Sequence, residues 1–267
     1  MMAKYVHGYT EREAGRLQDQ ADTLERLLHH DTRYAPGSTV LEAGCGIGSQ
    51  TVILARQSPG AQIFAVDISA DSLIVAREAV AAAALDNVRF QAADIHNLPL
   101  TAKSFDHIFI CFVLEHLTDP LAALRCLRPL LKAGGTITVI EGDHGSFYCH
   151  PHSDAAVAAV NCLVEVQRRL GGNALIGRQL YPLLDRAGYR QVHVSPRMVY
   201  VDSSKPALVD GFSKKTFIAM VQGVRRAALE MGLIDEVMWD KGISDLFHAT
   251  GQDGTFCYTF FKGYGLV

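Results

Sequence analysis

The chain has 267 residues, of which 49% are hydrophobic and 20% are charged, and its formal net charge is −3. This length suits one large domain, and the composition is that of a globular protein and not of a disordered one. No apolar stretch approaches the roughly 20 residues of a membrane-spanning helix. The longest basic clusters are pairs such as Lys214-Lys215, which is too little for a nucleic-acid footprint. We therefore expect neither a membrane nor a nucleic acid as a partner.

The cysteines and the first residues indicate a cellular setting. None of the six cysteines forms a C-x-x-C pair, so their spacing predicts neither a zinc site nor a disulfide framework. Residues 1–7 lack the apolar core of a secretory signal. A reducing, cytoplasmic location is the expectation that follows.

The first half of the chain alternates between predicted strands and helices. Thr10-Glu11-Arg12-Glu13 reads as a capping box, and the apolar residues after it recur at steps of three and four, which predicts a helix ending near residue 30. After a Pro36-Gly37 turn, five β-α units follow, which predicts a doubly wound parallel sheet. The expected strands are 39–43, 61–66, 88–93, 105–111 and 136–140, and the expected helices are 48–58, 70–84 and 120–131.

The second half departs from this rhythm. After Glu141 the sequence predicts a loop rich in His, Gly and Asp. Expected after it are helices at 154–170 and 177–187, a strand at 189–200, two or three helices within 204–249 and an aromatic strand at 255–262. We expect a single domain over 1–267, with an N-terminal helical cap at 1–35, a core at 38–142 and helical lid segments at 146–187 and 203–250.

A glycine-rich turn carries the first chemical signal. Glu42-Ala43-Gly44-Cys45-Gly46-Ile47-Gly48 follows a predicted buried strand and opens a helix, where glycines let backbone amides approach a ligand. The register is G-x-G-x-G, with Ser49 in place of the third glycine of a dinucleotide fingerprint. Asp67 closes the second strand, where a carboxylate can accept hydrogen bonds from a ribose diol, and Asp94 follows the third.

These residues, with Leu98-Pro99 and Leu114-Glu115-His116, resemble the class I S-adenosylmethionine-dependent methyltransferases over about 38–142. The resemblance implies an α/β, doubly wound, Rossmann-like sheet of seven strands with the last strand antiparallel and with helical lid additions. It also implies S-adenosylmethionine as the cofactor.

The resemblance further implies which residues bind the cofactor. Glu42, Gly44, Cys45 and Gly46 would surround its methionine part, with Gln50 on the following helix. Asp67 would hold the ribose and Asp94 the adenine amino group, with Ile68 and Ile95 against the ring. The backbone near Cys111 would face the methionine ammonium, and Tyr9 would close over its carboxylate. The cofactor-binding residues expected are Tyr9, Glu42, Gly44, Cys45, Gly46, Gln50, Asp67, Ile68, Asp94, Ile95 and Cys111.

Methyl transfer depends mainly on alignment, and a base is needed only where the acceptor must lose a proton. His144 is the first candidate for a base or an acceptor-orienting group, with Glu141 and His7 behind it and Glu115 and Tyr200 weaker still. Three histidines near Asp143 on a flexible loop do not define a metal site, so no metal is expected. The cysteines lack neighbours that would activate them.

Several functions stay open at this stage. Aromatic residues in the second half favour a small aromatic or apolar acceptor, methylated at oxygen, nitrogen or an electron-rich carbon. The alternatives are an RNA or protein methyltransferase, a nicotinamide-dependent dehydrogenase, and a cofactor-binding regulatory protein without turnover. The apolar stripe of the first helix fits its own sheet or the second subunit of a homodimer.

Overall fold

The computed structural model describes the backbone of residues 11–267 and the side chains of residues 15–267. The strands are β1 Thr39–Ala43, β2 Gln62–Asp67, β3 Val88–Ala92, β4 Phe105–Cys111, β5 Leu131–His150, β6 Arg190–Asp202 and β7 Thr255–Leu266. The main helices are α1 Glu11–His29, α2 Ser49–Gln57, α3 Ala70–Ala82, α4 Pro120–Leu127, α5 Asp154–Arg169, α6 Leu180–Arg186 and α10 Glu236–His248. The shorter segments are η1 Leu114–His116, η2 Arg128–Leu130, η3 Ile176–Gln179, α7 Pro206–Leu208, η4 Val209–Ile218 (a π-helix), α8 Ala219–Gly223 and α9 Arg225–Glu230.

All seven strands form one sheet in the order β3-β2-β1-β4-β5-β7-β6. The first five strands pair in parallel, and β7 lies antiparallel between β5 and β6. This arrangement confirms the expected fold, including the antiparallel last strand. The carboxyl ends of β1, β2, β3 and β4 therefore meet at one edge of the sheet, where α/β proteins bind ligands.

The strand β5 differs from the sequence-based expectation. The predicted strand ended at Ile140 and a loop was to follow Glu141, but β5 continues to His150 and pairs with β7 over that length. Between the pairs Asp143–Thr259 and Tyr148–Cys257, β5 has four residues where β7 has one. Such a bulge bends a strand and changes where its side chains point. The bulge interrupts the alternation of buried and exposed residues by which the sequence could have identified the strand. Residues 146–150, which were expected to begin a helical lid segment, belong to β5.

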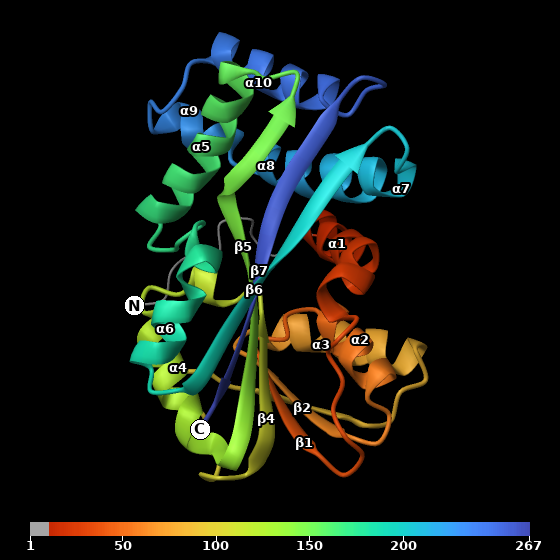
Figure 1. The fold of residues 1–267 in the computed structure, drawn as a ribbon, viewed down its shortest axis with the longest axis vertical. Helices are drawn as coiled ribbons and strands as arrows, with labels where there is room; N and C mark the ends of the chain where they lie inside the picture. The colour runs from red at the N-terminus through yellow and green to blue at the C-terminus, as the bar shows by residue number, and fades with distance from the viewer. Residues whose placement is uncertain (1–10) are drawn as a thin grey trace.

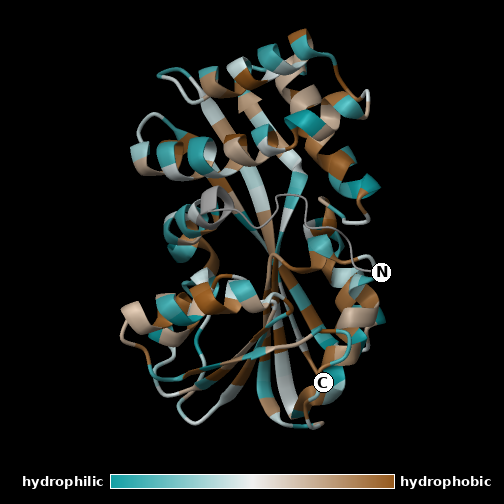
Figure 2. Ribbon diagram, turned by 180° about the vertical axis from the view of Figure 1, so that it is seen from behind, coloured by the Kyte–Doolittle hydropathy of each residue, from teal (hydrophilic) through white to brown (hydrophobic). Residues whose placement is uncertain are grey.

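The long strands β5, β6 and β7 carry a second group of helices. Figure 1 shows these strands running beyond the level of β1–β4, with α5, α8, α9 and α10 packed around their far half. Figure 2 shows hydrophobic colour along the central strands and alternating colour on the helices, as expected when each helix buries one face. No helix among residues 11–267 is long and apolar enough to cross a membrane.

Helix α1 uses its apolar stripe within the chain. Ala21, Leu24 and Leu28 are each at most 2% exposed. Leu24 and Leu28 belong to the same core cluster as Phe109 and Phe212. The stripe is therefore covered by the chain's own sheet and η4.

Candidate functional site

The turn between β1 and α2 has the backbone shape that its glycines predict. Gly44, Gly46 and Gly48 have φ values of 80°, 53° and 84°, in the left-handed region that side chains disfavour. The amide of Gly44 donates to the carbonyl of Val66 at 2.8 Å, which ties the turn to β2. A Cβ atom on Gly44 would lie 2.6 Å from Val113 Cγ2. The glycine turn therefore packs directly against the segment that follows β4.

Asp67 links the glycine turn to the end of β2. Its Oδ2 accepts from the amide of Gly46 at 2.8 Å, and its Oδ1 accepts from the amide of Ser69 at 2.9 Å. A carboxylate has about four acceptor positions, so one fixed in this way can still accept from a bound diol. The next side chain, Ile68, is 41% exposed and offers an apolar surface beside the carboxylate.

Glu42 lies beneath the glycine turn at the end of β1. Its side chain is 2% exposed, and Oε2 has no hydrogen-bond partner among the described residues. Burial, reinforced by the nearby carboxylate of Asp67, raises the pKa of Glu42 to about 7. The charged form of this buried carboxyl group would be stabilised by an adjacent cation such as an ammonium.

The other expected cofactor residues differ in exposure. Asp94 has a 41% exposed side chain, and its Oδ1 accepts from the amide of His96 at 2.9 Å, which lowers the pKa of Asp94. Ile95 is only 7% exposed, so it offers less surface to a ligand than Ile68 does. Gln50 Oε1 lies 2.7 Å from Nε2 of His29, so this side chain joins α2 to α1.

The two expected cysteines are buried at the same edge. Cys45 is 6% and Cys111 is 8% exposed, and burial raises the pKa of both thiols. Both are therefore neutral, weak nucleophiles. The parts of these two residues that a ligand could use are therefore their backbone groups, while their side chains pack in the core.

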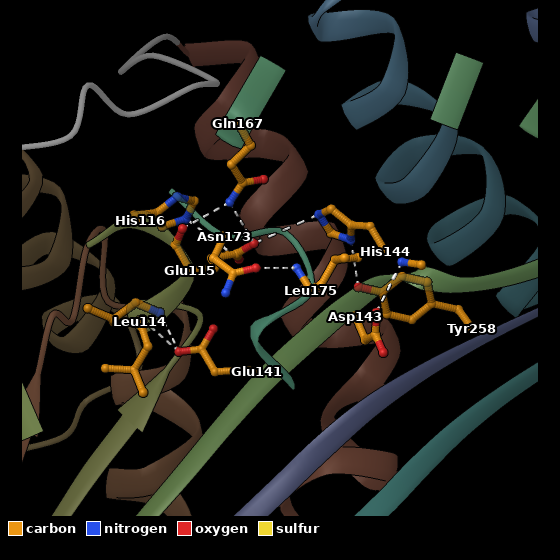
Figure 3. Close-up of polar contacts among 12 residues, drawn as sticks. Leu114, Glu115, His116, Glu141, Asp143, His144, Gln167, Asn173, Leu175 and Tyr258 are labelled. Carbon is orange, nitrogen blue, oxygen red and sulfur yellow. Dashed lines mark hydrogen bonds and ion pairs between the residues drawn. The ribbon is translucent and has the colours of Figure 1, made fainter. Parts of the chain in front are cut away.

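The turn η1 is held by Glu141, which the sequence placed among the catalytic candidates. Glu141 is fully buried, and its Oε1 accepts from the amides of Val113 and Leu114 at 3.0 and 2.7 Å (Figure 3). Burial raises the pKa of Glu141 well above its usual range. These contacts favour a positioning role, because Oε1 fixes the segment that presents Glu115, whereas Oε2 is buried with no hydrogen-bond partner among the described residues.

Glu115 is held from the side of α5 as well. Gln167, fully buried on α5, donates from Nε2 to the Glu115 carbonyl at 3.1 Å and to its Oε2 at 3.2 Å. The amide of Asn173 donates to the same carbonyl at 2.7 Å. The Glu115 carboxylate therefore has a defined position near the end of β4 and beside the bulge of β5.

His144 enters this cluster from the bulge in β5. It is 4% exposed, its Nδ1 lies 2.7 Å from the Tyr258 hydroxyl, and its Nε2 lies 3.8 Å from Glu115 Oε2 (Figure 3). Burial lowers the pKa of His144, so the imidazole is neutral at pH 7. The sequence singled out His144 but gave no reason to join it to Tyr258, which is 114 residues away.

Two further residues beside this cluster were not expected. Arg178 forms two hydrogen bonds to the buried carboxylate of Asp143, at 2.7 and 2.8 Å, and fixes the strand just before His144. Phe112, between β4 and η1, has a φ of 58°, and its ring centroid lies 5.5 Å from that of Phe260. A bulky residue in this conformation is uncommon outside functional segments.

Some candidates lie elsewhere or outside the described part of the chain. His7 and Tyr9 fall among residues 1–10, outside the described residues. His152 is exposed and pairs with Asp154 at 3.0 Å, away from His144. No group of three metal-binding side chains converges within the described part of the chain.

Comparison with known proteins identifies the class. A family described as "Methyltransferase domain" matches residues 35–188, more than half of the chain. An uncharacterized 37.1 kDa transposon protein of Streptomyces fradiae is 30% identical over 82% of this chain and 63% of its own length. A demethylmenaquinone methyltransferase of Staphylococcus aureus is 32% identical over 46% of this chain and 51% of its own. The chain thus spans less than two thirds of the length of these relatives.

Solved structures agree with the fold. A putative methyltransferase of Bacillus halodurans has a TM-score of 0.56 at 15% identity, covering 91% of this chain and 97% of its own. Phosphoethanolamine N-methyltransferase 2 of Haemonchus contortus, solved with S-adenosylhomocysteine, has a TM-score of 0.53 at 18% identity, covering 92% and 52%. The chain belongs to the methyltransferase-domain family, whose methyl donor is S-adenosylmethionine.

Proposed function

We propose that this chain transfers a methyl group from S-adenosylmethionine to a small-molecule acceptor. One observation carries the proposal, namely the left-handed glycine turn whose Gly46 amide is bound by Asp67. This arrangement places amides, a carboxylate and the exposed Ile68 at one sheet edge, and it suits a nucleoside joined to an amino acid. When bound, S-adenosylmethionine supplies an electrophilic methyl group on a sulfonium.

The described residues have distinct parts in this proposal. Asp67 holds the ribose hydroxyls, and Asp94 accepts from the adenine amino group beside Ile68. The buried carboxyl of Glu42 and the backbone near Cys111 face the methionine ammonium. Gly44 and Gly46 let the loop approach closely, with Cys45 packing beneath them and Gln50 setting the position of α1.

The acceptor belongs near His144, because this side chain lies in the bulge of β5 and beside η1, which follows the segment that packs on the glycine turn. Phe112, which is half-buried and packs against the buried ring of Phe260, offers aromatic surface there, which suits a small aromatic or apolar molecule. The helices within 146–187 and 203–250 would shape its pocket, and the N-terminal segment 1–35 would cap it. The net charge of −3 disfavours RNA as the acceptor.

The names of two relatives support a small-molecule acceptor. One is the demethylmenaquinone methyltransferase of Staphylococcus aureus. The other is methyltransferase GfsG of Streptomyces halstedii, 30% identical over 47% of this chain and 45% of its own length. Geranyl diphosphate C-methyltransferase of Streptomyces coelicolor shares the fold, with a TM-score of 0.52.

A labelling experiment tests the proposed function. The protein is incubated with S-adenosylmethionine carrying a radioactive methyl group and a bacterial extract separated into small-molecule, RNA and protein fractions. Label in the small-molecule fraction that disappears with excess S-adenosylhomocysteine is the expected result. Label in RNA or protein would support the macromolecular alternative. Binding of the cofactor without label in any fraction would support a protein without turnover.

A further inference from the structure

Two buried groups of opposite hydrogen-bonding character face each other between the bulge of β5 and η1, the turn after β4. His144 Nε2 lies 3.8 Å from Glu115 Oε2, and the two residues are 4% and 8% exposed. Nε2 has no hydrogen-bond partner among the described residues. A buried polar atom without a partner costs free energy, so its retention points to a ligand.

The contacts of Tyr258 define which imidazole nitrogen carries the proton. The Tyr258 hydroxyl lies 2.7 Å from His144 Nδ1, and Tyr258 is 1% exposed. A buried phenol needs an acceptor for its proton, and Nδ1 is the acceptor at that distance. Tyr258 therefore donates to Nδ1, and the neutral imidazole carries its proton on Nε2. Glu115 faces a donor.

We propose that His144 Nε2–H and the Glu115 carboxylate together bind a hydroxyl group of the acceptor, which is methylated at oxygen. This inference rests on the proposed function and names the acceptor class. An oxygen about 2.8 Å from both atoms completes a triangle with the observed 3.8 Å side, within normal hydrogen-bond geometry. The hydroxyl donates to Glu115 and accepts from His144.

S-adenosylmethionine would supply the methyl group, and Glu115 takes the proton that the acceptor loses. The hydroxyl oxygen forms the new O–C bond while its proton passes to the Glu115 carboxylate. The electron pair of the broken S–C bond stays on sulfur. Gln167 keeps donating to Glu115 Oε2, which holds the carboxylate in place. Glu115 is the base in this assignment, and His144 orients the oxygen.

The same pair discriminates against amines. A hydroxyl oxygen has two lone pairs, so one can accept from His144 while the other attacks the methyl group. A neutral amine has a single lone pair, and a hydrogen bond from His144 would occupy it. The arrangement therefore selects oxygen over nitrogen by chemistry and not by size.

The tautomer can be measured directly, without an acceptor. Protein labelled with nitrogen-15 in histidine is examined by NMR at pH 7.5, with His144→Phe used to assign the signal. The expected result is a neutral imidazole protonated on Nε2, and Tyr258→Phe, which keeps the ring packing, should give both tautomers. A wild-type imidazole protonated on Nδ1 overturns the proposal.

Matched acceptors test the class of the reacting atom. The probes are 7-hydroxycoumarin with 7-aminocoumarin, and phenol with aniline, because arylamines are neutral at pH 7.5. The expected result is methylation of the hydroxyl members only, with kcat about 10²- to 10⁴-fold lower in Glu115→Gln, since a base is lost. Tyr258→Phe should lower kcat about 2- to 12-fold, the value of one hydrogen bond. Equal or faster methylation of the amines overturns the proposal. If no probe reacts, the tautomer of His144 measured by NMR decides whether the proposal stands.

Controls separate this proposal from the function on which it rests. His152→Phe alters an exposed histidine away from the cluster and should leave methylation unchanged. Affinity for S-adenosylmethionine, measured by calorimetry, should be the same in Glu115→Gln, Tyr258→Phe and wild type. Failure of the wild type to bind the cofactor would refute the proposed function itself, whereas intact binding with the wrong tautomer refutes only this inference.

Discussion

Replacing Gly44 with alanine tests the packing of the glycine turn against the segment after β4. Gly44 has a φ of 80°, and an added Cβ would lie 2.6 Å from Val113 Cγ2 and 2.9 Å from its Cγ1. Gly37 provides a matched control, because its φ is 84° and nothing lies within 4 Å of the corresponding Cβ position. Both substitutions strain the backbone, but only the one at Gly44 also overpacks.

The expected losses of unfolding free energy follow from these two effects. A left-handed conformation costs an alanine about 1–2 kcal/mol. Overpacking adds about 1–3 kcal/mol where the neighbour cannot move freely. Gly44→Ala should therefore destabilise the protein by about 2–5 kcal/mol, whereas Gly37→Ala should cost only the first amount.

Urea unfolding of both variants and of Val113→Ala measures these terms. In the Val113→Ala background the cost of Gly44→Ala should fall to about 1–2 kcal/mol, because the methyl groups that block the Cβ are gone. Equal costs for Gly44→Ala and Gly37→Ala, with no rescue by Val113→Ala, would refute the packing of the glycine turn described above.

Three further predictions concern other charged groups of the site and its support. Asp67→Asn should weaken S-adenosylmethionine binding about 10- to 150-fold by calorimetry, since hydrogen bonds to a charged group contribute about 1.5–3 kcal/mol; an unchanged affinity would contradict the ribose assignment. Burial raises the pKa of Glu42 to about 7 from an unfolded value near 4.5, so the folded state binds more protons between these values and stability falls as pH rises through the window. Relative to Glu42→Gln, the wild type should lose about 3 kcal/mol of unfolding free energy between about pH 4.5 and pH 8 in the absence of cofactor, and parallel pH profiles would disprove it. Arg178→Met should cost about 1–3 kcal/mol in urea unfolding because it leaves the buried Asp143 carboxylate unpaired, whereas Arg168→Met, from an exposed pair, should cost less than about 1 kcal/mol, and equal costs would contradict this.

The parallel part of the fold could be predicted because its signals are local. The glycine turn, Asp67 and the cap residue Asp119 each lie within a few residues of the element that they start or end, so spacing alone placed them. The continuation of β5 past Glu141 could not be predicted, because its signals are not local. Gly142, Gly145 and the bulge interrupt the alternation, and the strand is maintained by pairing with β7 more than 100 residues away.

In the candidate site too, local motifs could be predicted from the sequence, whereas contacts between distant elements could not. Motif spacing identified Glu42, Asp67 and His144 as residues at the sheet edge. The partners that define their chemistry come from distant elements: Tyr258 on β7 for His144, and Gln167 on α5 for Glu115. No local pattern encodes such contacts, because they depend on strand register and on how α5 packs. The hydrogen bonds from the η1 amides to Glu141 are likewise invisible in the sequence, because they form only in the folded chain.

Parallel calorimetric titrations with S-adenosylmethionine, S-adenosylhomocysteine and NAD test the central claim most directly. The glycine turn, Asp67 and Glu42 predict micromolar binding of the first two ligands and no binding of NAD. Asp67→Asn should weaken the binding of both adenosyl ligands together. Binding of NAD alone would contradict the methyltransferase account and make the glycine turn a dinucleotide site.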